Sequence, residues 1–454
     1  MQPTHGEAVE RLRDALSSLP ADAPLRLAKR SSNLFRFGAR ETTPGLPTEG
    51  LDQVLSIDAE GRTAEVGGLI TYGELVAATL RHGLMPHVVP QLKTITLGGA
   101  VAGLGIESTS FYAGLPHESV VEMDVLTGAG ELVTATRGGA HDDLLRGLPN
   151  SYGTLGYALR LVIDLLPVKP YVTVRHLRFD DPKACFAAMA EICAERTHDG
   201  RPVDFLDGVV FGPREMYLTL GTFADEVPYA SDYTGMGIYY KSVRERRIDH
   251  LSVADYLWRW DTDWFWCSAA FGVQNPLVRA LWPRGLRRSD VYRKLVALDQ
   301  RHGVTARLDA MRGKRNEFVV QDVEVPIERA AEFLTEFCAE VPIRPIWLCP
   351  LALADSAPWP LYPLSPGETY VNFGFWATAP LREGQAGDHH NRYVERLVDG
   401  LGGHKSLYST VHYDRSEFWR HYNGEAYGRL KERYDPRGRF RDLYEKVAGD
   451  HATV

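Results

Sequence analysis

The sequence lacks the features that mark several classes of protein. Its five cysteines form no C-x-x-C pair and leave one over, which favours reduced thiols in the cytoplasm. A net charge of −8 argues against nucleic acid as a partner. We see no secretion signal, and the central apolar stretch is far shorter than the roughly 20 residues of a membrane-spanning helix. The remaining class is a globular protein, for which 44% hydrophobic and 24% charged residues are ordinary.

The common nucleotide-binding motifs are also absent. Residues 90–110, PQLKTITLGGAVAGLGIESTS, contain four glycines and no basic residue after Lys93. A Walker loop would need lysine after its last glycine, but Leu104 follows Gly103, and a Rossmann fingerprint would need glycine where Ser108 stands. Such dense glycine allows backbone N–H groups to face a diphosphate, or allows a buried turn to pack closely. The remaining nucleotide-binding option is a glycine-rich loop from a different dinucleotide fold.

A chain of 454 residues is long enough for two domains. Strands and short helices interleave through the first third, and a second organisation begins at Pro170. There the order strand, helix, strand, strand occurs twice, which predicts one antiparallel sheet with helices on one face, an α+β domain. The predicted elements are 172–179, 182–197, 205–211 and 216–222, and then 317–325, 327–340, 343–348 and 369–376.

Between these two halves, residues 251–282 contain eight aromatic side chains and are followed by three arginines. One interpretation is docking at a lipid interface, where amphipathic rings settle. On that interpretation, changing Trp264 and Trp266 to alanine lowers binding to anionic liposomes. The other interpretation is a core helix with the wall of a substrate pocket. Both suit an apolar substrate.

Five segments spread over nearly the whole chain point to a known family. They are TITLGGAVAGLGIESTSFYAGL, NSYGTLGYALRLVIDLLPVKPYV, QDVEVP, RPIWLCP and EFWRHYNGEAYGRL. They resemble flavin-dependent oxidases and reductases of the vanillyl-alcohol oxidase type, and within that group the delta-24 sterol reductase family. More narrowly, KTITLGGAVAGLGIESTSF followed by GLPHES resembles the actinobacterial branch that reduces 10-methylene fatty-acyl chains in tuberculostearic acid (10-methylstearate) synthesis.

The resemblance implies an α+β protein with a two-part PCMH-type FAD-binding domain and a substrate domain that contains an antiparallel sheet. We expect the FAD-binding domain at residues 1–170, the substrate or cap domain at 171–405, and the C-terminal return to the FAD domain at 406–454. Some members of the wider group link the flavin through a histidine in the first phosphate loop. That loop here has none, which predicts non-covalent FAD; its residues are Arg30, Ser31, Ser32 and Asn33.

The resemblance also implies which other residues bind the cofactor. Those along the pyrophosphate would be Thr96, Gly98, Gly99, Ala100 and Val101, with Gly103, Gly105 and Ser108 nearer the flavin. The cofactor cleft would be completed by Asn150, Ser151, Gly153 and Gly156, and Ile163 would meet the adenine through backbone atoms.

Reduction of an isolated C=C bond sets specific demands on a site. No carbonyl accepts negative charge, so protonation must lead or accompany hydride transfer and give a tertiary carbocation. The site therefore needs a general acid and aromatic walls. Glu107 is a candidate acid, because it is the one ionisable residue between Lys93 and Tyr112. The alternative is a turn carboxylate satisfied by neighbouring N–H groups.

Further candidates come from the second half of the chain. His412 is a second catalytic candidate, and Arg433 would offset charge on the reduced flavin; for both, the alternative is a solvated surface group. The substrate-pocket candidates Tyr370, Asn372 and Trp376 lie on one predicted strand with period two and so share a face. For them the alternative is core packing. We expect no metal.

These observations lead to a main hypothesis and three alternatives. The main hypothesis is an FAD-dependent reductase of the 10-methylene group of a phospholipid-bound fatty-acyl chain, with NADPH as electron donor and a fatty-acid methyltransferase as a partner. We expect a cytoplasmic protein with peripheral contact at the inner face of the membrane. The alternatives are a delta-24 sterol side-chain reductase, an FAD-dependent alcohol or sugar oxidase, and a non-catalytic flavin-bound partner of the methyltransferase.

Overall fold

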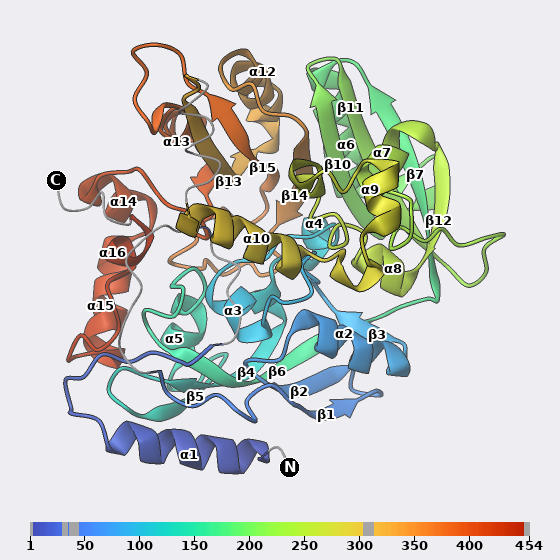
Figure 1. Ribbon diagram of the computed structural model, residues 1–454. Coiled ribbons are helices and arrows are strands. Elements are labelled where there is room, and N and C mark those ends of the chain that lie inside the picture. The colour runs from blue at the N-terminus through green and yellow to red at the C-terminus, as the bar shows by residue number, and fades with distance from the viewer. Residues whose placement is uncertain (1–2, 30–34, 36–44, 303–312, 449–454) are drawn as a thin grey trace.

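Two large β-sheets organise the molecule. The computed structural model describes residues 3–29, 35, 45–302 and 313–448. In Figure 1 the first sheet and its helices form the lower layer, coloured blue to green, and the second sheet forms the upper layer. Helix α10 (Ser289–His302) crosses the front between them, and the C-terminal helices run along one side.

The first sheet is antiparallel and has the order β1-β2-β6-β4-β5, with β3 paired to β6. Its longest strand, β6, lies between β2 and β4. Alternate side chains of this strand, such as Leu161 and Ile163, are fully buried, as expected of a strand inside a sheet. The strands are β1 (Val54–Asp58), β2 (Thr63–Gly67), β3 (Leu84–Pro86), β4 (Val120–Leu126), β5 (Leu132–Thr136) and β6 (Tyr157–Pro167). The helices around this sheet are α1 (His5–Ser17), α2 (Tyr72–Thr79), α3 (Leu97–Ala102) and α5 (Asp142–Gly147), while α4 (Ser110–Ala113) packs against the second sheet.

The second sheet is also antiparallel and has the order β12-β7-β11-β10-β14-β15-β13-β16. The α+β prediction with one antiparallel sheet is therefore confirmed. The strands are β7 (Tyr171–Phe179), β10 (Phe205–Gly212), β11 (Glu215–Ala224), β12 (Ile248–Ser252), β13 (Asn316–Pro326), β14 (Ile346–Ala352), β15 (Thr369–Pro380) and β16 (His404–Lys405). A separate pair consists of β8 (Thr197–His198) and β9 (Arg201–Pro202).

The two faces of the second sheet have different surroundings. Helices α6 (Pro182–Glu195), α12 (Ala330–Glu340) and α13 (His389–Gly400) pack on one face, where Phe373 and Phe375 of β15 belong to the core. Because side chains alternate along a strand, Asn372 and Trp376 lie on the opposite face, toward the first layer. This second face is the one that meets the candidate site.

The aromatic segment is part of the core between the layers. Trp264 and Trp266 are each only 6% exposed, and Trp260 is 1% exposed. The lipid-docking role predicted for Trp264 and Trp266 is therefore wrong, because buried rings cannot enter a bilayer, and the core and pocket-wall interpretation is correct. The helices in and around this segment are α7 (Tyr239–Glu245), α8 (Val253–Leu257), α9 (Pro276–Leu281) and α10.

The end of the chain returns to the first layer. Three helices form it: α14 (Arg415–His421), α15 (Gly424–Tyr434) and α16 (Leu443–Val447). The side chains of Arg433 and Tyr434 on α15 bond to the carboxylate of Asp143 on α5 at 2.8 and 2.7 Å. The predicted domain limits stay predictions. Near the limit predicted at residue 170, the chain passes from β6 in the first sheet to β7 in the second sheet.

Candidate functional site

A cleft of about 860 Å³ lies between the two layers. One wall comes from the glycine-rich segment of residues 90–106 and the turn of residues 152–158. The opposite wall comes from the second sheet and the aromatic segment, with the side chains Trp264, Phe265, Asp322, Trp347 and Trp376. The volume lies within the range of cofactor-binding pockets.

Glycine is required where the first wall packs on the sheet. A Cβ atom at Gly68 would clash with the carbonyl oxygen of Ala158, and one at Gly98 would lie 2.7 Å from the carbonyl oxygen of Gly68. Helix α3 in this wall is capped by Thr96, whose hydroxyl accepts a hydrogen bond from the N–H of Gly99 at 3.2 Å. The glycines therefore allow close packing, and the N–H groups of Gly98, Gly99 and Gly103 donate hydrogen bonds within the protein. Binding of a diphosphate by this segment stays a prediction.

Positive charge gathers around the cleft although the chain as a whole is acidic. Among the described lining residues, five are basic and one is acidic: Arg26, Lys29, Arg293, Arg441 and Lys446, against Asp322. The ammonium group of Lys446 donates to the carbonyl oxygen of Tyr152 at 2.8 Å. Basic side chains in the wall of a cleft suit the phosphates of a dinucleotide such as FAD.

The predicted cofactor residues divide into two groups. Those that line the cleft are Thr96, Gly98, Gly99, Ala100, Gly103, Gly105, Gly153 and Gly156. Those that the described lining does not include are Val101, Ser108, Asn150, Ser151 and Ile163, all of them buried. Ile163 is paired on both sides, with Ala64 and with Val120, so its backbone belongs to the sheet. The predicted loop of Arg30, Ser31, Ser32 and Asn33 lies outside the described residues.

Asn150 supports the cleft wall from behind. Its side-chain amide donates to the carbonyl oxygen of Leu361 at 2.8 Å, and its backbone N–H donates to the carbonyl oxygen of Gly103 at 3.0 Å. Asn150 has a φ of 61°, a left-handed conformation that asparagine tolerates better than most residues. The geometry thus gives Asn150 a role in holding the glycine segment in position.

Glu107 does not occupy the position expected of the general acid. Its carboxylate is buried and lies 2.8 Å from the guanidinium of Arg259, which also lies 2.7 Å from the carboxylate of Asp207. Burial raises the pKa of Glu107, and the charge of Arg259 opposes that shift. Glu107 is absent from the described lining of the cleft. The alternative of a carboxylate satisfied by its neighbours fits this geometry.

The other two catalytic candidates also lie away from the described lining. The backbone N–H of His412 donates to the carboxylate of Glu395 at 3.0 Å, and its ring nitrogen Nδ1 lies 3.5 Å from Asp388. Arg433 forms its ion pair with Asp143 at 2.8 Å, with half of the arginine side chain exposed. Neither side chain belongs to the described lining of the cleft, so the catalytic roles of His412 and Arg433 stay predictions.

The three substrate candidates share a strand but not a position. Trp376 lines the cleft, and its ring centroid lies 4.3 Å from that of Phe265. Asn372 is fully buried, and the hydroxyl of Tyr370 bonds to Glu368 at 2.8 Å. Tyr370 and Asn372 are absent from the described lining. The three residues therefore share one face of β15, as predicted, but only Trp376 lines the cleft.

Sequence reasoning missed an acidic group that does line the cleft. Asp322 on β13 faces the cleft beside Tyr408, and burial raises the pKa of this carboxyl to about 7. A signal was present in the motif QDVEVP, where Asp322 and Glu324 alternate with two buried valines. Two acids on one face of a strand whose other face is apolar point to a second, functional surface.

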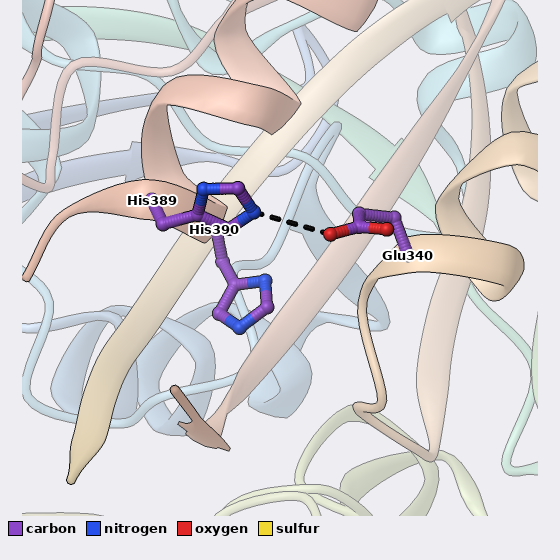
Figure 2. Close-up of side chains that lie close together, drawn as sticks. All are labelled: Glu340, His389 and His390. Atoms are coloured by element: carbon purple, nitrogen blue, oxygen red, sulfur yellow. Dashed lines mark hydrogen bonds and ion pairs between the residues drawn. The ribbon is translucent and has the colours of Figure 1, made fainter. Parts of the chain in front are cut away.

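A group of potential metal ligands lies elsewhere. Figure 2 shows Glu340 on α12 with His389 and His390 on α13, on the helical side of the second sheet. His389 bonds to Glu340 at 3.1 Å, but the ring of His390 points in another direction and its Nε2 lies 3.2 Å from the carbonyl oxygen of Pro380. One ligand atom from each of the three side chains lies within 4.8 Å of the other two, so this group could hold a metal ion that the sequence analysis did not expect.

Comparisons with known proteins agree with a flavin site. Residues 7–136 match the FAD binding domain family. The Delta(24)-sterol reductase of Homo sapiens is 28% identical over 416 residues, which cover 87% of this chain and 76% of that protein. The Arabidopsis thaliana enzyme of the same name is 27% identical over 429 residues, 87% of this chain and 74% of that protein. Cytokinin dehydrogenase 7 of Oryza sativa subsp. japonica is 30% identical over 146 residues, covering 32% and 28%.

Proposed function

Because this chain is an FAD-dependent oxidoreductase with a PCMH-type FAD-binding domain, related to Delta(24)-sterol reductases over most of its length, we propose that it reduces an isolated C=C bond of a lipid. The preferred substrate is the 10-methylene group of a phospholipid-bound fatty-acyl chain, which becomes a 10-methyl group. NADPH supplies the electrons. The observation that carries the proposal is a cleft with a glycine-rich wall on one side and aromatic rings with one protonatable acid on the other.

The described residues fit FAD. The basic groups that line the cleft would hold its phosphates, and Gly103 and Gly105 belong to the same wall. When bound, FAD supplies transfer of a hydride equivalent. We propose that it is held without a covalent bond. Acid denaturation of the holoenzyme should then release all of the yellow colour into solution, whereas flavin retained on the precipitate would contradict this.

The aromatic wall suits the charge that develops on the substrate. Phe265 packs against Trp347 at 5.6 Å and against Trp376 at 4.3 Å between ring centroids. Trp264 stacks on Phe35 at 5.7 Å. These ring faces exclude water from an apolar chain and stabilise a tertiary carbocation by cation–π attraction, worth about 0.5–2 kcal/mol per favourable contact. Protonation of either a methylene group or a trisubstituted sterol alkene gives such a cation.

The test is an anaerobic half-reaction. The purified holoenzyme is reduced with NADPH and then mixed with phospholipid that carries a 10-methylene chain, while flavin absorbance is followed. Recovery of absorbance together with a gain of two hydrogens in the lipid supports the proposal. Recovery only with a sterol side-chain alkene would favour the sterol reductase that the relatives' names suggest. No reduction by NADPH, with fast reoxidation by air, would favour an oxidase, and bound FAD without any turnover would favour a non-catalytic partner of a methyltransferase.

A lipid-bound substrate requires a route from the bilayer, and α9 offers a surface for it. No helix within the described residues is long and apolar enough to cross a membrane. Leu277 and Leu281, one turn apart on α9, are 78% and 85% exposed. Residues 276–294 contain six basic residues and one acidic residue. Of the basic residues, Arg279 and Arg287 are buried, and those that are exposed are Arg284, Arg288 and Lys294. Exposed leucines beside basic side chains suit an anionic phospholipid surface.

This surface continues toward the cleft. Trp282, which follows α9, packs against Tyr292 on α10 at 6.4 Å between ring centroids, and the next residue on α10, Arg293, lines the cleft. We propose that anionic membrane binds here and that a methyltransferase supplies the methylene lipid on the same membrane. The double variant L277E/L281E should lower binding to anionic vesicles at least tenfold with FAD content unchanged, while V121E on the first sheet should not. Equal loss in both variants would contradict this surface.

A further inference from the structure

Asp322 is held on the cleft wall by a fit that only glycine permits. Asp322 on β13 pairs directly with Gly374 on β15. A Cβ atom at Gly374 would clash with the carboxylate of Asp322 and lie 2.7 Å from the ring of Trp376. The absence of a side chain at residue 374 therefore makes the space in which the carboxyl group lies beside the indole.

Three neighbours form hydrogen bonds at this position. The indole N–H of Trp376 donates to the hydroxyl oxygen of Tyr408 at 2.8 Å, and the hydroxyl of Tyr408 is hydrogen-bonded to the carboxyl of Asp322. The side-chain amide of Asn372 donates to Asp322 at 3.4 Å. Asp322, Tyr408 and Trp376 all line the cleft, so the chain of hydrogen bonds ends at the substrate space.

Burial keeps Asp322 protonatable against the effect of the charged groups around it. Burial raises its pKa to about 7, and the hydrogen bonds from Asn372 and Tyr408 and the charge of Lys405 oppose the shift. Lys405 on β16 directs its ammonium group to the hydroxyl of Ser409 at 3.0 Å and lies 3.9 Å from Glu395. Arg293 on α10 lines the same cleft. At neutral pH the carboxyl can therefore both hold a proton and release it.

Glu324, two residues further along β13, is a similar acid in a different place. Burial raises its pKa to about 8, with the nearby Asp322 adding to the shift. Its carboxylate accepts a hydrogen bond from Ser406 at 2.8 Å. Glu324 is absent from the described lining of the cleft, so it provides a matched control for Asp322.

We propose that Asp322, together with the hydroxyl of Tyr408, is the proton donor that completes reduction of the alkene. The inference rests on the proposed reductase function. The C=C bond gains one proton from the Asp322 and Tyr408 pair and one hydride equivalent that originates from NADPH. The substrate thus gains two hydrogens and two electrons, NADPH becomes NADP⁺, and the carboxylate left at Asp322 takes a proton from solvent at the mouth of the cleft.

The experiment separates the two half-reactions in the holoenzymes of wild type, D322N and E324Q. Reduction of the flavin by NADPH should agree within about threefold in all three, because the proton donor takes no part in it. Reoxidation by the methylene lipid should slow about 100-fold or more in D322N, the lower end of what a general acid contributes, and by less than about threefold in E324Q. The pH dependence of reoxidation above pH 7 should disappear in D322N.

A spectroscopic readout accompanies the kinetics and needs no substrate. Infrared difference titration of the wild-type holoenzyme should show the carbonyl band of a carboxylic acid that titrates near pH 7, and D322N should lose this component. If wild type reduces the lipid and D322N does so equally fast, the role of Asp322 is refuted while the reductase function stands. If wild type reduces no alkene, the proposed function fails. Absence of the titrating band in wild type also overturns the proposal.

Discussion

Two clusters of buried acids make an instructive comparison. Glu107 and Asp207 share the cation Arg259, and Asp322 and Glu324 lie near the cation Lys405. Burial raises the pKa of Glu107 as it raises those of Asp322 and Glu324. The clusters differ in access, because Asp322 lines the cleft and Glu107 faces a guanidinium 2.8 Å away. A shifted pKa alone therefore does not identify the acid of a reaction; its position does.

Removal of the cation from the first cluster should have the largest effect. R259M leaves Glu107 and Asp207 buried without their partner, and the packing of the guanidinium over the ring of Tyr256, 4.0 Å from its centroid, is also lost. We expect the free energy of unfolding in urea to fall by about 3–5 kcal/mol. The control R13M breaks an exposed pair with Glu10 and should change it by less than about 1 kcal/mol. Equal stability of R259M and R13M would show that the first cluster is not structural.

The second cluster should lower the stability of the folded protein as pH rises. The raised pKa of Asp322 means that the folded state holds its proton between about pH 4 and pH 7, where the unfolded state has released it. Wild type therefore loses stability as pH rises through this window, and D322N, which does not titrate, escapes that loss. The stability of D322N relative to wild type should rise by about 2–3 kcal/mol from about pH 5 to about pH 8, measured by urea unfolding of the holoenzymes. A difference that stays constant with pH would contradict a raised pKa.

Filling the space beside Asp322 should disturb the site with a smaller cost in stability. In G374A the new methyl group would collide with the carboxyl of Asp322 and the ring of Trp376. We expect a loss of about 1–3 kcal/mol in stability and a lipid-dependent reoxidation slowed at least tenfold. The control is G428A inside α15, where a methyl group meets no atom within 4 Å. It should leave reoxidation unchanged and raise stability by about 0.5–1 kcal/mol. Normal reoxidation in G374A would show that the close fit is not needed.

The smallest effect is expected at Tyr408. Y408F removes the hydroxyl that bonds to both Asp322 and Trp376 but leaves the carboxyl in place. Loss of a hydrogen bond to a charged group corresponds to about 1.5 kcal/mol, so lipid-dependent reoxidation should slow about tenfold. Rapid mixing measures the rate, with reduction by NADPH as the internal control. A loss as large as that in D322N would make Tyr408 the main donor.

Local pattern was enough to predict much of the fold. The repeated order of strand, helix, strand and strand appears in the structure, from β7 to β11 and from β13 to β15, because alternation and helical periodicity are properties of neighbouring residues. The glycine-rich segment was also visible, since backbone that must lie close to other atoms excludes side chains.

The proposed acid, Asp322, could be predicted only in part. The motif QDVEVP indicates a polar strand face but does not show which acid meets a cleft. Arg259 pairs with Glu107 although the two residues lie 152 positions apart in the sequence, and no local sequence pattern predicts such a pair. The surroundings of Asp322 depend on distant parts of the chain. Strand β13 pairs with β15, and Tyr408, which follows β16, forms a hydrogen bond with the carboxyl of Asp322. The aromatic segment was ambiguous for the same reason, because burial of Trp264 and Trp266 depends on packing between layers.

The most direct test of the account is the pH dependence of a single turnover. NADPH-reduced wild-type enzyme is mixed without oxygen with the 10-methylene phospholipid from about pH 5 to about pH 9, and the rate of flavin reoxidation is recorded. If Asp322 must be protonated, the rate is constant below about pH 7 and falls close to tenfold for each further pH unit. A rate that is independent of pH, or that rises with pH, would contradict proton donation from this carboxyl.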